Sequence, residues 1–256
     1  RGLYDLAWVA RMLDWAEDAS LSSAGRATFL ASSALALDPI VARGGHAEPH
    51  GREAIAQLAS RQQTAHDRLL GALGETGIRV VDWSALGPGA RAELRELYCK
   101  ELFPLVMPQA SGPAHPFPRV SSLSLNLLVA YRAGRVRPLE YARIKVPRTH
   151  SASRFLAVPS APASWVPIES IIAGNLDLLL PGARVEACTA FRPTRSSRPG
   201  VACHGPIVRL EVAPERPEVL CAALARILHF DASRIETAGF LGVEDWETVA
   251  DALPRR

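Results

Sequence analysis

The chain has 256 residues, of which 48% are hydrophobic, and its 29 basic and 26 acidic side chains leave a formal net charge of +3. This length and apolar share predict one or two globular domains with a sizeable core. Charge so nearly balanced gives no argument for a nucleic-acid or membrane partner. No apolar run reaches the ~20 residues of a membrane-spanning helix, and the first residues, 1–6, do not have the pattern of a signal peptide. Because it begins at Arg1 instead of Met, we expect a processed or excised piece.

The first part of the chain has the pattern of helices. Apolar residues at helical spacing predict a helix over residues 4–18. Ser22 and Ser23 can cap a second helix that is rich in alanine, the best helix former. Pro39 is expected to start a turn or to lie in the first turn of a further helix, because proline lacks the N–H that an interior position donates.

Two further helices follow before the character of the sequence changes. A helix over residues 51–73 would bury Leu58 and Leu69 and leave His66 in water. Another is predicted over residues 90–102. Short connections are typical of antiparallel neighbours, so we expect this region to form an antiparallel helical bundle.

A proline-rich run separates this bundle from the rest of the chain. Pro113, Pro116 and Pro118 fix φ and lack a backbone donor, so no helix continues through them. From Leu123 to Leu128, leucines alternate with other side chains, which predicts a strand with one buried face.

The second part mixes strands and helices. The predicted strands cover residues 123–132, 139–146, 154–158, 165–168, 185–191 and 206–212. The predicted helices cover residues 169–180, 218–228 and 244–253, and residues 193–204 have the composition of a loop. Since strict βαβ alternation is missing, we expect an α+β domain.

Cysteine and histidine spacings predict no metal site. The cysteines show no paired spacing, which is typical of reduced thiols in a cytosolic protein; they are Cys99, Cys188, Cys203 and Cys221. His46 and His50 flank Pro49, so no helix holds them as a ligand pair, and Cys203-His204 lacks a second pair. His115, set among prolines, is interpreted as a turn residue, with a catalytic histidine as the alternative.

Basic residues recur near the strand ends of the second part. Neither a glycine-rich phosphate loop nor a nucleophile elbow occurs. Arg143, Lys145, Arg192 and Arg195 are therefore our candidates for contact with a polyanion, since Arg and Lys pair with phosphate oxygens. The alternative is a solvated surface balanced by acidic residues. The residue types alone indicate no catalytic site.

Eight blocks of sequence, in order, resemble the long polyphosphate kinases. The run His115-Pro-Phe-Pro-Arg-Val-Ser-Ser-Leu-Ser-Leu-Asn-Leu127 resembles the family's HPFPFISNLSLNL. The other similar blocks are Asp5–Val9, Phe29–Asp38, Leu102–Pro108, Tyr141–Pro147, Val166–Leu176, Phe191–Arg195 and Gly205–Val212.

The resemblance implies a two-domain α+β protein. A helical N-terminal domain would span residues 1–104 and a mixed α+β head domain residues 105–256. It implies part of a cytoplasmic enzyme, or one at the periphery of a membrane, that passes the terminal phosphoryl group of ATP through a phosphohistidine to polyphosphate. That histidine, and most ligands of ATP and Mg²⁺, would lie in domains absent from this chain, which would be inactive alone. The head domain would support a homo-oligomer, and no nucleic-acid partner is implied.

The resemblance also assigns residues that would line a nucleotide-binding site. By family position, Ala36, Asp38 and Arg43 would be nucleotide-binding. Ala36 stands where the family has an Asn that contacts the nucleotide, and Met12 stands where another family Asn lies. The segment before Gly205 is shorter than the family's long charged helix. These departures keep open an alternative, a stand-alone non-catalytic homologue that acts as a binding or scaffold module.

Overall fold

A computed structural model of the chain describes residues 2–44, 49–111, 117–134, 137–148, 154–197, 205–215 and 217–253. It confirms the α+β class, with a helical region followed by mixed sheet and helices. The chain divides into two compact units: unit 1 comprises Arg1–Arg79, Thr194–Arg209 and Gly242–Arg256, and unit 2 comprises Val80–Pro193 and Leu210–Leu241. Because these units follow packing and not chain order, the expected boundary at residue 104 stays a prediction. None of the described helices is long and apolar enough to cross a membrane.

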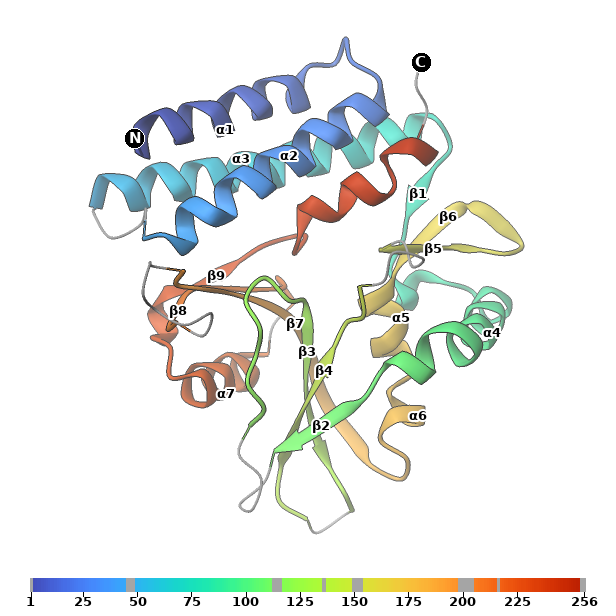
Figure 1. Cartoon of the computed structure of the whole chain (residues 1–256). Coiled ribbons are helices and arrows are strands. Elements are labelled where there is room, and N and C mark those ends of the chain that lie inside the picture. The colour runs from blue at the N-terminus through green and yellow to red at the C-terminus, as the bar shows by residue number, and fades with distance from the viewer. Residues whose placement is uncertain are drawn as a thin grey trace. The chain divides into compact units, whose positions relative to one another are not determined.

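Three helices dominate unit 1: α1 (Gly2–Glu17), α2 (Ser23–Ala42) and α3 (Pro49–Glu75). Figure 1 shows them side by side, with α1 and α2 running in opposite directions. The Ser22 hydroxyl accepts a hydrogen bond from the Gly25 N–H at 3.2 Å and so caps α2 as expected. The prediction for Pro39 was wrong, because Pro39 lies inside α2. It falls near the end of the helix, where burial of Ile40 and Val41 offsets the lost backbone donor.

The last described segment of the chain packs on α2. The 3₁₀ helices η5 (Val243–Thr248) and η6 (Ala250–Ala252) replace the α-helix predicted over residues 244–253. Val243, Glu244, Asp245, Trp246 and Val249 are all buried there, so burial in this segment follows its packing and not one amphipathic face. His66, predicted to lie in water, is 5% exposed, with its ring 5.8 Å from that of Trp246.

A six-stranded sheet has the order β2-β4-β3-β7-β8-β9. Its strands are β2 (Pro108–Ser111), β3 (Asn126–Arg132), β4 (Glu140–Lys145), β7 (Arg184–Arg195), β8 (Ile207–Val212) and β9 (Ile235–Thr237). The pairs β2–β4, β4–β3 and β3–β7 are antiparallel, and β8–β9 is parallel. The two edge strands, β2 and β9, were not predicted.

The central strand β3 is buried on both faces, so the prediction of one buried face was wrong. Leu127 lies opposite Ile144 of β4 and belongs to the main core of unit 2. Its neighbours Asn126 and Leu128, which point to the other face, are also fully buried. Leu123 has a positive φ of 59° and precedes the strand.

A second sheet and several helices complete the fold. The sheet has the order β1-β6-β5, formed by β1 (Arg79–Val80), β5 (Phe155–Val158) and β6 (Ala161–Pro167). The helices are α4 (Pro88–Leu97), α5 (Ile168–Gly174), α6 (Leu176–Leu179) and α7 (Glu218–Leu228), with short 3₁₀ turns at Trp83–Ala85, Phe103–Leu105 and Ala232–Arg234 and a π turn at Tyr98–Leu102. The helix predicted over residues 169–180 is divided at Asn175, whose amide donates to the Ile171 carbonyl.

Candidate functional site

A cleft between α1 and α2 is the candidate site of unit 1. Its volume is about 290 Å³. It is lined by Asp5, Trp8, Ala36, Pro39, Ile40 and Arg43. The α2 residues are spaced by three, one and three positions, so they share one helix face, and the two α1 residues are three apart. Each helix therefore presents one face to the cleft.

The cleft combines an aromatic ring with an exposed pair of opposite charges. The Trp8 side chain is 57% exposed, although large aromatic residues are usually buried. The Arg43 guanidinium lies 4.0 Å from the Asp5 carboxylate, and both side chains are more than half exposed. A solvent-exposed pair at this distance contributes little stability, so Arg43 can exchange Asp5 for another anion. An indole face can stack on a base, and a guanidinium can bind a phosphate.

The nucleotide residues assigned by resemblance do not all reach this cleft. Ala36 and Arg43 line it, whereas Asp38 is 5% exposed and does not. Two positions along a helix correspond to a rotation of about 200°, which places Asp38 away from the face that carries Ala36. The sequence prediction missed Asp5 and Trp8. The signal that could have found them is the conspicuous tryptophan one helical turn after an acidic residue at the start of α1.

The polyanion candidates lie in different surroundings. In unit 2, the Arg143 side chain is buried and donates to Asn126 Oδ1 at 2.8 Å and to Gln109 Oε1 at 3.1 Å. Burial lowers the pKa of Arg143. Lys145 follows on the same face of β4 and is exposed. Arg192 is also buried, with Nη1 2.9 Å from Glu211 Oε2.

In unit 1, Arg195 donates to the Gly205 carbonyl at 2.9 Å. Lys145 is therefore the candidate whose charged group faces solvent, and the role of all four residues stays a prediction. His46, His115 and the pair Cys203-His204, discussed above from the sequence, lie outside the described residues.

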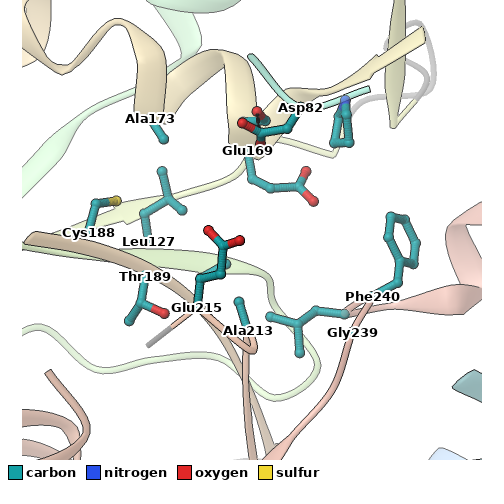
Figure 2. A pocket seen from close by; sticks show the side chains of 14 residues that line it. Asp82, Leu127, Glu169, Ala173, Cys188, Thr189, Ala213, Glu215, Gly239 and Phe240 are labelled. Carbon is teal, nitrogen blue, oxygen red and sulfur yellow. Dashed lines mark hydrogen bonds between the residues drawn. The ribbon is translucent and has the colours of Figure 1, made fainter. Parts of the chain in front are cut away.

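Unit 2 contains a second cavity, with a volume of about 340 Å³ (Figure 2). Among the described residues, its lining includes no basic side chain but three carboxylates, those of Asp82, Glu169 and Glu215. This charge makes the second cavity a poor site for a nucleotide or polyphosphate, which carry the same sign of charge.

Two groups in that lining have shifted pKa values. Burial acts to raise the pKa of Asp82, but hydrogen bonds from Ser170 and Ser84 outweigh it, so the pKa lies below its ordinary value. Burial raises the pKa of the Cys188 thiol to about 12, so this thiol stays protonated at neutral pH. The cysteines among the described residues are free.

Comparison with known proteins finds similarity to polyphosphate kinases. Residues 90–201 match the family model described as "Polyphosphate kinase middle domain". The polyphosphate kinase of Streptomyces coelicolor is 36% identical over 214 residues, which cover 75% of this chain and 28% of the relative. That of Mycobacterium avium is 32% identical over 300 residues, which cover 96% of this chain and 41% of the relative.

A solved structure agrees in fold. The crystal structure of polyphosphate kinase from Porphyromonas gingivalis superposes with a TM-score of 0.79 at 22% identity, over 97% of this chain and 40% of that one. The chain thus spans less than half the length of these relatives.

Proposed function

We propose that this chain, which resembles the N-terminal and middle regions of the polyphosphate kinases, is the corresponding portion of an ATP:polyphosphate phosphotransferase. The observation that carries the proposal is the 32% identity with the Mycobacterium avium enzyme over 96% of this chain. In the proposed reaction, a histidine outside this chain takes the terminal phosphoryl group of ATP and passes it to polyphosphate. Such a covalent step divides one difficult displacement into two easier ones.

Within that reaction, unit 1 would form one side of the nucleotide-binding site. Trp8 would stack on the base, and Arg43 would release Asp5 to pair with a phosphate oxygen. Ala36 offers the ligand only a methyl group, so this wall adds van der Waals contact there and no hydrogen bond. We therefore expect the chain alone to bind ATP weakly, in the millimolar range, and to be inactive alone.

The remaining assignments belong to the whole enzyme. ATP would arrive with Mg²⁺, but no group of three His, Cys, Asp or Glu side chains in the described ranges is placed to hold a metal ion. By the family resemblance, the metal would be held by the phosphates and by residues outside this chain. Lys145, exposed at the end of β4, would contact polyphosphate, with Arg143 buried beside it on the same face of the strand. We further propose a cytoplasmic homo-oligomer assembled through the middle region.

One observation favours a second function. Ala36 points its methyl group into the cleft, at the position where the family resemblance assigns a nucleotide-contacting Asn. A stand-alone homologue that serves as a binding or scaffold module would tolerate that change. Met12 does not strengthen this alternative, because it is a core residue with 5% exposure and does not line the cleft.

An NMR titration of the Trp8 indole N–H signal with ATP–Mg²⁺ separates these functions. The phosphotransferase proposal predicts a saturable shift at millimolar ATP that weakens about fivefold in Arg43→Gln, the loss expected for an exposed ion pair. Arg52→Gln, which removes an exposed charge from α3, is the matched control and should change nothing. A micromolar affinity would contradict the role given to Ala36. If the Trp8 signal does not shift at ATP concentrations up to about 10 mM, ten times the expected dissociation constant, the result would favour the binding or scaffold module.

A further inference from the structure

Arg143, on β4 of unit 2, is a buried cation that pairs with no carboxylate among the described residues. Its guanidinium makes three hydrogen bonds, all to neutral acceptors: Asn126 Oδ1 at 2.8 Å, Gln109 Oε1 at 3.1 Å and the Arg119 carbonyl at 3.0 Å. Burial alone shifts its pKa, and the residues of unit 2 outside the described ranges include no Asp or Glu. A buried charge is unfavourable unless a counter-charge compensates it, so this arrangement indicates a place for an anion.

Neighbouring side chains direct the guanidinium toward the end of β4, which lies between β2 and β3 in the sheet (Figure 1). The Asn126 amide donates to the carbonyl and the hydroxyl oxygen of Ser124, at 2.7 and 3.0 Å, so its own oxygen is left to face Arg143. In the register of β3 and β4, Asn126 lies opposite Lys145 and not opposite Arg143. Since Arg143 Nε donates to Asn126, the Arg143 side chain leans along β4 toward Lys145.

Three sets of donors at this end of β4 are left for a ligand. Arg143 Nη2 lacks an acceptor in the described part of the chain yet is not fully buried, so this corner of the guanidinium reaches the surface. Lys145 is exposed, forms no ion pair with a described residue, and follows Arg143 on the same face of β4. Gln109, opposite Arg143 on β2, is exposed and uses its carboxamide oxygen on Arg143, which leaves its N–H groups to donate.

The chemistry of these donors selects a phosphate group. Guanidinium, ammonium and amide N–H groups all donate, so together they suit an oxyanion, and Arg and Lys pair with phosphate oxygens. A terminal phosphate group carries a charge of about −1.5 to −2 near neutral pH, which two cations balance. The preceding residue on this face of β4 is Tyr141, and the β3 residues opposite Lys145 and Arg143 are Asn126 and Leu128. No row of cations therefore continues across these described positions for a longer chain of phosphates.

We propose that Arg143, Lys145 and Gln109 bind one phosphate group, with Asn126 and Ser124 as positioning residues. Arg143 Nη2 and Lys145 Nζ would each donate to a phosphate oxygen, and Gln109 would complete the site from β2. The ligand is orthophosphate or the terminal group of a polyphosphate chain, which present the same chemistry. The proposal deepens the polyphosphate contact given above to Lys145 and rests on it only for the source of the phosphate. The group is bound and not transferred, so no covalent bond changes at this site.

The test follows the side-chain amide signal of Asn126 in NMR spectra of the ¹⁵N-labelled whole chain, during titration with orthophosphate at low ionic strength. We expect a saturable shift with a dissociation constant of about 1 mM. Lys145→Gln should weaken binding by up to about fivefold, as for an exposed ion pair. Arg184→Gln removes an exposed cation from the opposite end of the same sheet, so it is the matched control and should leave the affinity unchanged.

Gln109→Glu tests the missing counter-charge directly. It places a carboxylate where the structure has a neutral acceptor, 3.1 Å from Arg143 Nη1, at an exposed position. The new carboxylate would pair with Arg143 and repel phosphate. The affinity should therefore fall at least about tenfold, as for the loss of one hydrogen bond to a charged group, while the melting temperature stays unchanged or rises. An unchanged affinity in this variant would overturn the proposal.

Three other results would also overturn it. One is an Asn126 signal that does not shift at orthophosphate concentrations up to about 10 mM, ten times the expected constant. Another is equal weakening by Lys145→Gln and Arg184→Gln, which would indicate general attraction to a basic surface. The third is an affinity for tripolyphosphate more than about tenfold above that for orthophosphate, which would replace the single-phosphate site with a longer one and leave the polyphosphate contact standing. Conversely, bound orthophosphate that polyphosphate does not displace would support the single-phosphate site and contradict the polyphosphate contact.

Discussion

Arg154 connects three segments of unit 2, and its replacement tests how that unit is stabilised. Its guanidinium, 4% exposed, donates from Nε to Glu169 Oε2 at 2.8 Å, from Nη2 to Glu169 Oε1, and from Nη1 to the Leu241 carbonyl at 3.0 Å. It also covers the Phe240 ring. Arg154→Met keeps much of the side-chain length and the apolar contact but removes the charge and every donor.

The expected loss of stability follows from the Glu169 carboxylate, which is left unpaired when Arg154 is replaced. Removing one partner of a buried ion pair costs about 3–5 kcal/mol, mainly because the other charge is left unpaired. Since the Glu169 side chain is 15% exposed and lines a cavity, water can reach it in part. We therefore expect a loss of about 3 kcal/mol, at the lower end of that range. The measurement is the free energy of unfolding from urea denaturation.

Two further variants make the test specific. Arg154→Met with Glu169→Leu replaces the whole pair with apolar groups and should recover most of the loss, because no buried charge is left unpaired. Arg184→Gln removes an arginine that is 80% exposed and 3.5 Å from Glu186, and should cost less than ~1 kcal/mol. If Arg154→Met is no more destabilising than Arg184→Gln, or if the double variant is less stable than Arg154→Met, the reasoning is refuted.

Three more predictions concern single positions in unit 2. A Cβ at Gly174 would lie 2.3 Å from the Trp83 Nε1, so Gly174→Ala should destabilise by about 1–3 kcal/mol despite the better helix propensity of alanine; an unchanged urea midpoint would contradict this. Because the folded-state pKa of Asp82 lies below 3.8, its carboxylate stabilises the fold above that pH, and this contribution is lost as pH falls through the folded value. The stability difference between wild type and Asp82→Asn should therefore shrink from pH 7 to pH 3, and a constant difference would contradict the assignment. The buried Tyr98 hydroxyl has no hydrogen-bond partner among the described residues, so Tyr98→Phe should leave the free energy of unfolding unchanged or raise it by up to ~1 kcal/mol, whereas a clear loss would indicate a hidden partner.

The long elements were predictable because their apolar spacing is a local signal. Residues 4–18 and 51–73 correspond to α1 and α3, and residues 218–228 are the bounds of α7. The short edge strands β2 and β9 have four and three residues, too few for a period to appear, and they form by pairing with distant strands. Burial of His66 depends on Trp246, which lies far along the chain, so no local pattern indicates it.

The candidate site was predictable in part. The resemblance located α2 and, through it, Ala36 and Arg43. Helix geometry could have excluded Asp38 from their face, because residues two apart on a helix do not face the same way. The contribution of α1 depends on which of its faces packs on α2, and this is settled by tertiary contacts. The acidic cavity of unit 2 brings together residues from Asp82 to Leu241, a set with no signature in the sequence.

The most direct test of the proposed function is to incubate the native protein, captured from its source with an antibody against this chain, with γ-³²P-labelled ATP and to separate the product by mass. The proposal predicts a labelled protein well above the 27.6 kDa of this chain, with acid-labile and base-stable phosphate as expected for phosphohistidine. An unlabelled native protein would contradict it and would favour a binding or scaffold module.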